Sequence, residues 1–259
     1  MKNEKWFCVF CILTSGFMSK AQTAEVASGL YVWEDLTFKS GQMRAGKRFM
    51  EGSSPHFEYL EIHTTTQQAG AKPAPPHTQE NIEEVIIVKE GLMKMTMDGE
   101  SRTLGAGSVV LIPPLVEQSM ENVGDGPLAY YVMMFRSKKP MDVERGVEAG
   151  GAMFLSRDQL VLEKTVKGGR IAYFDRPTAM CEKFEMHVTR LDHKGSSHDP
   201  HSHVDTEIIL ITEGETTLVL DGEEIDAKAG DFYFIKSGQT HGIKNKLDEP
   251  CEYFAFRWF

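Results

Sequence analysis

The stretch from Gly195 to Gly214, GSSHDPHSHVDTEIILITEG, places three potential metal ligands, His201, His203 and Glu207, at the start of an apolar run. Side chains two residues apart share one face of a β-strand, so an extended backbone lets His201 and His203 converge on one ion. A third imidazole, His241, follows a second apolar run farther along the chain. Three imidazoles and one carboxylate form a mixed nitrogen and oxygen set that suits Fe(II), Mn(II), Ni(II), Cu(II) or Zn(II).

Two motifs in this part of the chain resemble those of the cupin superfamily. The first runs from Gly195 to Gly214 and matches the family pattern at every fixed position. The second runs from Gly230 to Asn245 and departs from the pattern only at Lys236, where proline is usual. The resemblance does not specify a reaction, because this fold hosts many chemistries. It implies a β-barrel with one divalent metal, held by His201, His203, Glu207 and His241.

The chain repeats itself at a shift of 123 residues. Residues 84–91 line up with 207–214, and residues 97–100 line up with 220–223. The segments 97–100 and 220–223 each contain an Asp-Gly pair, which favours a hairpin. Short β-rich runs separated by turns predict an all-β chain of two tandem jelly-roll barrels, a bicupin. We expect an N-terminal cupin domain at 22–140, a C-terminal cupin domain at 141–259 and a polar linker within 137–152.

The first half of the repeat has changed at the positions that matter for a metal. Gln79 stands where the second half has His203, and Gln118 stands where it has His241. Amide oxygens coordinate transition metals weakly compared with imidazole. The N-terminal set is therefore predicted to be degenerate, either a vestigial barrel kept as scaffold or a mixed site for a metal or ligand. Its members are His77, Gln79, Glu84 and Gln118.

A Glu-x-His pair precedes the metal motif in both halves, at Glu61 and His63 and at Glu185 and His187. In each pair the two side chains share one face of the expected strand. Because the pair persists in the half that lost its ligands, we predict a structural role for it at the contact between the barrels.

Four further residues could act on a substrate. His198 lies three residues before His201 and is the candidate acid or base, although a loop histidine is often only solvated. Lys236, Arg170 and Arg257 could bind an anionic group of a substrate. A surface position is the alternative for Lys236, and strand alternation alone does not say which way Arg257 faces.

Residues 1–21 have the pattern of a secretion signal. Lys2 and Lys5 precede an apolar stretch, 6–17, that is too short to span a bilayer, and Ser19-Lys20-Ala21 fits a small-x-small cleavage site. A buried N-terminal strand is the alternative. We expect export to the periplasm or the outside of the cell. There the two remaining cysteines, Cys181 and Cys251, could pair or stay as separate buried thiols.

The charge of the chain narrows the class of partner. The formal net charge of the 259 residues is −10, and the signal segment contributes three lysines and one glutamate. The mature chain is thus more negative still, so we do not expect it to bind nucleic acid or an anionic membrane. A small-molecule substrate is the expected partner, and the resemblance to cupins also implies that a homodimer could form through strand edges.

Three functions fit these residues. In the first, Fe(II) or Mn(II) holds a chelating substrate beside O₂, as in cupin dioxygenases. In the second, the metal is a Lewis acid on a carbonyl or amide, as in cupin isomerases, lyases and aminohydrolases. In the third, the protein is a non-catalytic module that binds a metal-chelated carbohydrate or acid. We expect a metal-dependent, dioxygenase-like enzyme acting on a small oxygenated molecule, with Zn(II), Ni(II) or Cu(II) as alternative metals.

Overall fold

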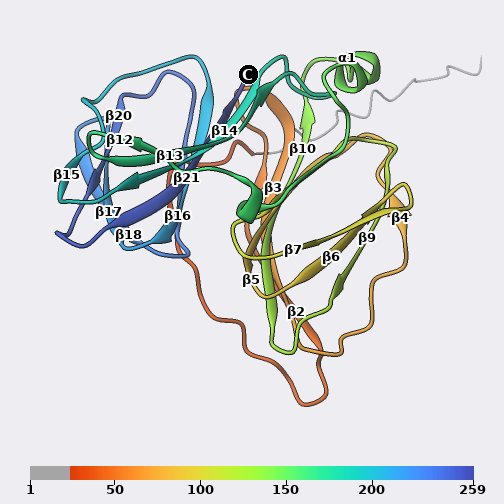
Figure 1. The fold of residues 1–259 in the computed structure, drawn as a ribbon. Helices are drawn as coiled ribbons and strands as arrows, with labels where there is room; N and C mark the ends of the chain where they lie inside the picture. Colours follow the sequence, from red (N-terminus) through yellow and green to blue (C-terminus); the bar gives the residue numbers. More distant parts are fainter. Residues whose placement is uncertain (1–23) are drawn as a thin grey trace, which may run out of the picture.

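A computed structural model of the chain describes residues 24–259, and the predicted signal segment lies outside them. The described chain is nearly all β, as the sequence predicts, and forms two barrels side by side (Figure 1). Strands from 44 to 137 build the N-terminal barrel, and strands from 163 to 258 build the C-terminal barrel. All strand pairs within the four sheets are antiparallel, as in a jelly roll.

The N-terminal barrel combines a six-stranded sheet, in the order β11-β8-β5-β10-β3-β2, with a four-stranded sheet, β4-β9-β6-β7. Its own strands are β2 (Arg44–Gly52), β3 (Phe57–Gln67), β4 (His77–Thr78), β5 (Glu83–Glu90), β6 (Met93–Met97), β7 (Glu100–Leu104), β8 (Val109–Ile112), β9 (Glu117–Asn122) and β10 (Leu128–Ser137).

The C-terminal barrel combines a seven-stranded sheet, β1-β19-β16-β21-β14-β13-β12, with a four-stranded sheet, β15-β20-β17-β18. Its own strands are β12 (Glu163–Thr165), β13 (Gly168–Arg176), β14 (Phe184–Leu191), β15 (Gly195–Ser196), β16 (Thr206–Glu213), β17 (Glu215–Leu220), β18 (Glu223–Lys228), β19 (Phe232–Ile235), β20 (His241–Asn245) and β21 (Cys251–Trp258).

The two barrels exchange short strands. β1 (Gly29–Tyr31) pairs with β19 of the C-terminal barrel, and β11 (Met153–Leu155) pairs with β8 of the N-terminal barrel. The predicted linker contains the helix α1 (Val143–Glu148), and a 3-10 turn at Arg157–Gln159 follows β11. A division of the chain at residue 140 therefore assigns most strands to the barrel they belong to. The exceptions are β1, which precedes residue 140 but pairs in the C-terminal barrel, and β11, which follows it but pairs in the N-terminal barrel.

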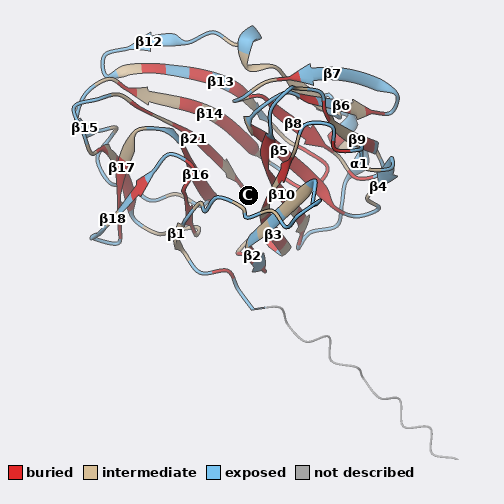
Figure 2. Ribbon diagram, turned by 90° about the horizontal axis from the view of Figure 1, so that it is seen from below, coloured by how far each residue is buried: buried red, intermediate tan, exposed pale blue. Residues whose placement is uncertain are grey.

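The large sheets of the two barrels pack against each other, so their strands are buried on both faces (Figure 2). In β16, Ile208 and Leu210 face the core between the barrels, whereas Ile209 and Ile211 face the interior of the C-terminal barrel. β5 divides in the same way between the shared core and the N-terminal barrel. Burial on both faces explains why these strands read as continuous apolar runs rather than as alternating ones.

Both predicted Asp-Gly hairpins form. Asp98 and Gly99 have φ angles of 45° and 83°, and Asp221 and Gly222 have φ angles of 50° and 91°. Two successive positive φ angles define a type I′ turn, whose twist matches that of the strands it joins. These turns connect β6 to β7 and β17 to β18 at equivalent places in the two barrels.

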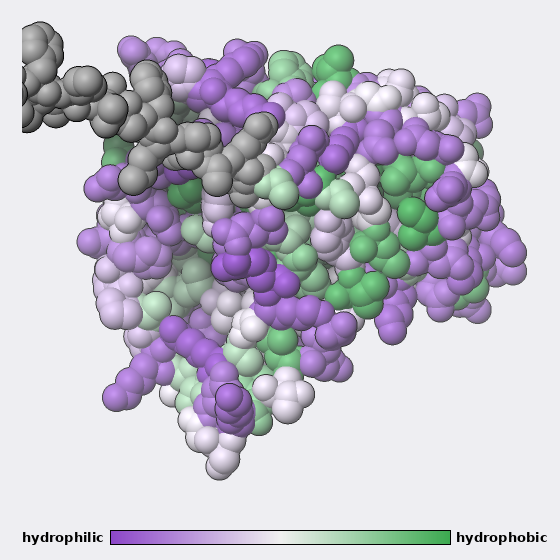
Figure 3. All heavy atoms as spheres, turned by 180° about the vertical axis from the view of Figure 1, so that it is seen from behind, coloured by the Kyte–Doolittle hydropathy of each residue, from purple (hydrophilic) through white to green (hydrophobic). Residues whose placement is uncertain are grey.

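Polar side chains predominate on the face of the molecule in Figure 3, with hydrophobic residues in scattered groups, as is usual for a protein surface. Among residues 24–259, no helix is long and apolar enough to cross a membrane.

Candidate metal centre

The backbone brings the two predicted motifs together before any metal is considered. His201 and His241 form an antiparallel bridge, in which each amide donates to the carbonyl oxygen of the other at 2.9 Å and 2.8 Å. The amide of Gly238 donates to His203 O at 2.8 Å. His201 and His203 thus lie in a tethered loop, not in a continuous strand, while Glu207 lies on β16.

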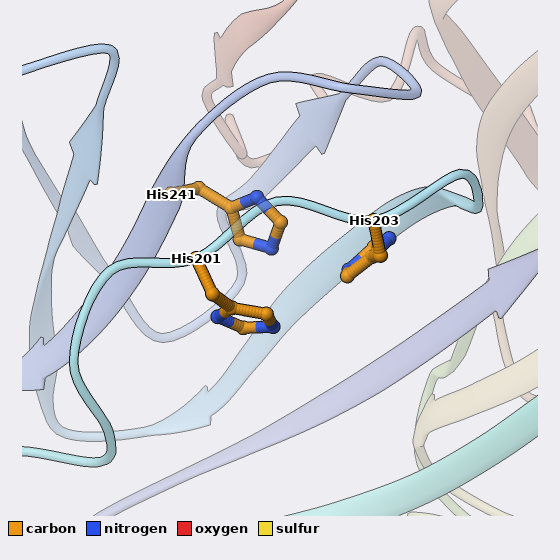
Figure 4. Close-up of side chains that lie close together, drawn as sticks. All are labelled: His201, His203 and His241. Atoms are coloured by element: carbon orange, nitrogen blue, oxygen red, sulfur yellow. The ribbon is translucent and has the colours of Figure 1, made fainter.

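The side chains of the three histidines converge (Figure 4). One ring nitrogen from each of His201, His203 and His241 lies within 4.8 Å of the others. The carboxylate of Glu207 joins them, because its Oε2 atom lies 3.1 Å from His203 Nε2 and 3.0 Å from His241 Nε2. The structure therefore brings all four predicted ligands into one cluster.

Backbone carbonyls fix two of the rings. His203 Nδ1 lies 3.2 Å from Asp205 O, and His241 Nδ1 lies 3.0 Å from Gln239 O. A ring nitrogen that faces a carbonyl oxygen carries the hydrogen, so Nδ1 donates in both rings and Nε2 faces Glu207. A neutral Nε2 and a carboxylate oxygen at 3 Å repel each other unless a proton or a metal ion lies between them. This donor set, with its outer carbonyls, fits a divalent metal.

The charges in the cluster match that interpretation. Burial raises the pKa of Glu207, but without a metal ion, protons on Nε2 of His203 and His241 bind the carboxylate, outweigh burial and bring the pKa to about 2. Burial lowers the pKa of His241, but the same contact with Glu207 outweighs it and raises this pKa. Burial and the neighbouring imidazoles lower the pKa of His201. Glu207 is thus ionised and His201 neutral at neutral pH, which are the forms that bind a metal.

A cavity of about 360 Å³ opens beside the cluster, inside the C-terminal barrel. Strand alternation accounts for its walls, because the residues of β14 and β21 that do not face the shared core point into it. Besides the four clustered residues, its lining comprises His187, Thr189, Ser197, His198, Asp199, Ile209, Ile243, Tyr253, Ala255 and Arg257.

Comparison with protein families agrees with this geometry. The cupin domain family matches residues 63–134 and 187–257, which together make up more than half of the chain. The protein is a cupin. The two matches fall one in each barrel, so it is a bicupin.

Solved structures of the same fold resemble this cupin at low sequence identity. The protein Ylba from E. coli superposes with a TM-score of 0.66 at 16% identity, covering 88% of this chain and 87% of that one. AerE from Microcystis aeruginosa gives 0.61 at 14% identity, covering 83% and 97%. Salicylate 1,2-dioxygenase from Pseudoaminobacter salicylatoxidans, in adducts with gentisate, gives 0.61 at 15%, covering 89% and 81%. No curated protein matches the sequence.

The predicted acid or base, His198, and one of the three predicted substrate-binding residues, Arg257, line the cavity. The ring of His198 packs edge-on against His201, with centroids 4.6 Å apart, and its Nδ1 lies 3.0 Å from Asp199 O. Arg257 enters from β21, and its Nε donates to Glu185 Oε2 at 3.0 Å. Arg257 therefore faces the barrel interior, which the sequence alone left open.

The other two cationic residues lie elsewhere. Arg170 reaches Glu185 from β13, donating from Nη2 to Oε1 at 3.0 Å, and is not among the described residues that line the cavity. Lys236 pairs with Glu25 at 3.2 Å, so its ammonium also lies outside the cavity wall formed by the described chain. Neither residue is placed to contact a substrate at the metal centre.

The sequence reasoning missed His187. Its Nδ1 lies 2.6 Å from Glu185 Oε1, and the ring lines the cavity, so the predicted place at the contact between the barrels is wrong. The contact is instead made by Phe184, Met186 and Val188, the other face of β14. Both faces of β14 are buried. The alternation of residues along the strand therefore assigned the side chains to two faces, but it did not show which face lies inside the barrel and which contacts the other barrel.

The N-terminal barrel has the corresponding cavity, of about 240 Å³. His77 pairs with Gln118 across β4 and β9, as His201 bridges His241 in the other barrel. Glu84 occupies the place of Glu207, but burial raises its pKa, and the nearby Gln118 and Gln79 amides only partly offset this. All four predicted members, His77, Gln79, Glu84 and Gln118, line this cavity together with His63.

The two cysteines are buried and free. Cys181 belongs to the core between the barrels, whereas Cys251 belongs to the interior of the C-terminal barrel. Burial raises the pKa of both thiols, that of Cys251 to about 11. The structure thus has two separate buried thiols, one of the two alternatives.

Proposed function

We propose that this bicupin is a metal-dependent enzyme that acts on a small oxygenated molecule in the C-terminal barrel, with dioxygenase-like chemistry. One observation carries the proposal. Three imidazoles and an ionised carboxylate converge at the wall of a cavity of about 360 Å³ that also contains an arginine and two further histidines.

His201, His203, Glu207 and His241 would hold the metal. When bound, an Fe(II) or Mn(II) ion would supply redox chemistry and two positions for exchangeable ligands. Glu207 lowers the positive charge of the site, and the carbonyls of Asp205 and Gln239 keep Nε2 of His203 and His241 available. The residues of the chain that would hold the metal are therefore already gathered around one place.

The position of Arg257 favours a substrate that carries an anionic oxygen. Its Nε is engaged by Glu185 and its Nη1 lies 3.9 Å from Asp205 Oδ2, so these two acids hold the guanidinium on the cavity wall. The remaining N–H groups can donate to a carboxylate or enolate oxygen. Salicylate 1,2-dioxygenase has a similar fold and is known in adducts with gentisate, an aromatic hydroxy acid. A hydroxy acid or enediol that carries adjacent oxygens is the class of substrate we infer.

A second candidate, an isomerase, lyase or aminohydrolase, is favoured by the two extra histidines. His187 is paired with the buried Glu185, which fixes Nδ1 as the donor and leaves Nε2 as a possible proton acceptor. His198 is oriented in the same way by Asp199 O. Either ring could move a proton at a substrate carbon beside a carbonyl.

Oxygen consumption by the Fe(II)-loaded protein tests the two candidates. The substrates are a panel of dihydroxybenzoates, enediols, diketones and flavonols, and His203→Ala is the inactive control. Uptake that the control abolishes supports the dioxygenase. Proton exchange beside a carbonyl without uptake supports the second candidate. Binding of a panel member, seen as thermal stabilisation, with neither reaction would contradict both and leave a binding module.

We also propose that the protein is exported. Lys2, Lys5 and the apolar stretch after them support this, although they lie outside the described residues. Intact-mass measurement after expression in a secreting host should give a mature chain that begins at Gln22. A full-length chain in the soluble fraction would oppose export.

A further inference from the structure

The cavity of the N-terminal barrel is too polar to be an empty remnant of the core. It lies where the C-terminal barrel has its metal centre, and it measures about 240 Å³. Its walls include Gln67, Gln79, Glu84 and Gln118, whereas the interior of the barrel beyond it is packed with aliphatic side chains. Natural pockets with a few polar groups set in an apolar wall are the usual places for small ligands.

Two buried amides in this cavity have polar atoms with no hydrogen-bond partner among residues 24–259. Gln118 is 1% exposed, and neither its Nε2 nor its Oε1 makes a hydrogen bond of normal geometry among the described residues. Gln67 is also 1% exposed; its Nε2 donates to Tyr130 Oη at 3.0 Å, but its Oε1 has no partner there. Each unsatisfied polar group costs about 1–3 kcal/mol, so a molecule in the cavity that pairs with these atoms gains hydrogen bonds that the described chain does not supply.

The unpartnered atoms define what such a molecule must offer. The Gln118 amide acts on the Glu84 carboxyl without the geometry of a normal hydrogen bond, so its Nε2 can still take an acceptor, while Gln118 Oε1 and Gln67 Oε1 each require a donor. A carboxylate has acceptors only, so it would leave both Oε1 atoms unpaired and would lie near the buried carboxyl of Glu84; the guanidinium of Arg44 also lines the cavity but donates to Lys72 O. A hydroxyl both donates and accepts, and Met120, Val132 and Met134 provide an apolar wall for C–H groups. We propose that the N-terminal barrel binds a small neutral polyol, of about monosaccharide size, without a metal.

This site is independent of the metal centre. The matched positions in the C-terminal barrel are occupied by His203 and His241, and both contact Glu207. In the N-terminal barrel, Gln79 and Gln118 replace those rings, and the buried Gln118 amide, which makes no hydrogen bond of normal geometry among the described residues, can contact a ligand rather than an ion. A metal-free protein should therefore bind the polyol as well as the metal-loaded one does.

Calorimetric titration of EDTA-treated protein with D-glucose, D-galactose, D-mannose and glycerol tests the proposal, with acetate and D-gluconate as anionic probes. We expect at least one neutral probe to bind at a single site and the anions to bind at least tenfold more weakly. Gln118→Leu should weaken binding at least tenfold, because it removes a donor and an acceptor. His203→Ala, which disables the metal centre, should leave binding unchanged.

Folding of the variants is checked by thermal unfolding. Leucine at 118 removes an unsatisfied amide from an apolar surrounding, so we expect no loss of stability. Gln67→Met is the second variant, should Gln118→Leu fail to fold. The proposal is overturned if no neutral probe saturates the protein, if an anion binds more tightly, or if the loss follows His203→Ala rather than a folded Gln118 or Gln67 variant.

Discussion

The two barrels share one backbone plan and differ in the state of one buried carboxyl group. Glu207 and Glu84 occupy equivalent places on β16 and β5. Two imidazoles outweigh burial at Glu207 and bring its pKa to about 2, whereas the two amides near Glu84 do not outweigh burial, and its pKa is raised. Two substitutions thus accompany the change from a carboxylate among three imidazoles to a carboxyl group beside two amides.

The largest effect that this comparison predicts concerns metal content. His203→Ala should remove most of the bound metal, because it deletes an imidazole ligand and leaves Glu207 with one ring contact. The loss of affinity should exceed the ~10–100-fold typical of an outer-sphere change. Gln79→Ala, at the equivalent position, should leave the metal content unchanged. Elemental analysis after dialysis measures both, and equal loss in the two variants would show that the N-terminal barrel also holds the ion.

The second-largest effect is expected when the two missing imidazoles are introduced into the N-terminal barrel. Gln79→His together with Gln118→His would give the N-terminal barrel three imidazoles and the carboxyl of Glu84, so we expect metal stoichiometry to rise from about one to about two per chain. Gln79→Asn with Gln118→Asn is the matched control, since it keeps amides at both positions. A ratio that stays near one in the histidine variant would mean that features beyond these two side chains decide metal binding.

The sequence predicted which three histidines and which carboxylate cluster, because the spacing of these residues reflects a backbone constraint. His201 and His241 must bridge each other, and Glu207 must follow on the inner face of β16, so the fold leaves little freedom in residue number. The hairpins at Asp98 and Asp221 were predictable for the same reason, since positive φ angles there favour Asp-Gly.

Other features left no such signal. His187 and Arg257 lie on strands buried on both faces, where apolar neighbours do not distinguish the inside of a barrel from the contact between barrels. The exchanged strands β1 and β11 have three residues each, too few to show a period of two. Both are fixed by tertiary packing rather than by local sequence.

A pH-dependent difference in stability is expected at the residue before Glu84, the carboxyl group that the first repeat shares with the second. Glu83 is fully buried on the face of β5 toward the other barrel, where the second repeat has Thr206. Burial raises its pKa to about 7, against hydrogen bonds from Thr178 and Met180. The folded state thus holds this proton more tightly than the unfolded chain does, so stability from Glu83 is present below about pH 4.5 and declines as pH rises through about 7.

Glu83→Gln should remove this decline while keeping an oxygen for the Met180 amide. We expect the variant to match the natural protein near pH 4 and to exceed it at pH 8 by an amount of the order of 3 kcal/mol at most. The half-buried Arg176 interacts electrostatically with Glu83. Because the variant removes this negative charge, the gain in stability at pH 8 will be smaller. Urea unfolding at the two pH values measures the difference, and an equal change at both would place the titration elsewhere.

The smallest effect should come from Lys236, the residue that departs from the cupin motif. Its counterpart in the first repeat is Pro113, but here the backbone N–H is used, since it donates to Gln239 Oε1 at 3.0 Å. Within the part of the chain that the structure describes, the ammonium has one ion-pair partner, the half-exposed Glu25, and exposed ion pairs contribute about 0–1 kcal/mol. Lys236→Ala should therefore leave metal content and KM unchanged and shift stability by less than ~1 kcal/mol, whereas Arg257→Ala should raise KM for an anionic substrate. A raised KM in Lys236→Ala alone would mean that a substrate reaches past the cavity wall to the exchanged strand β1.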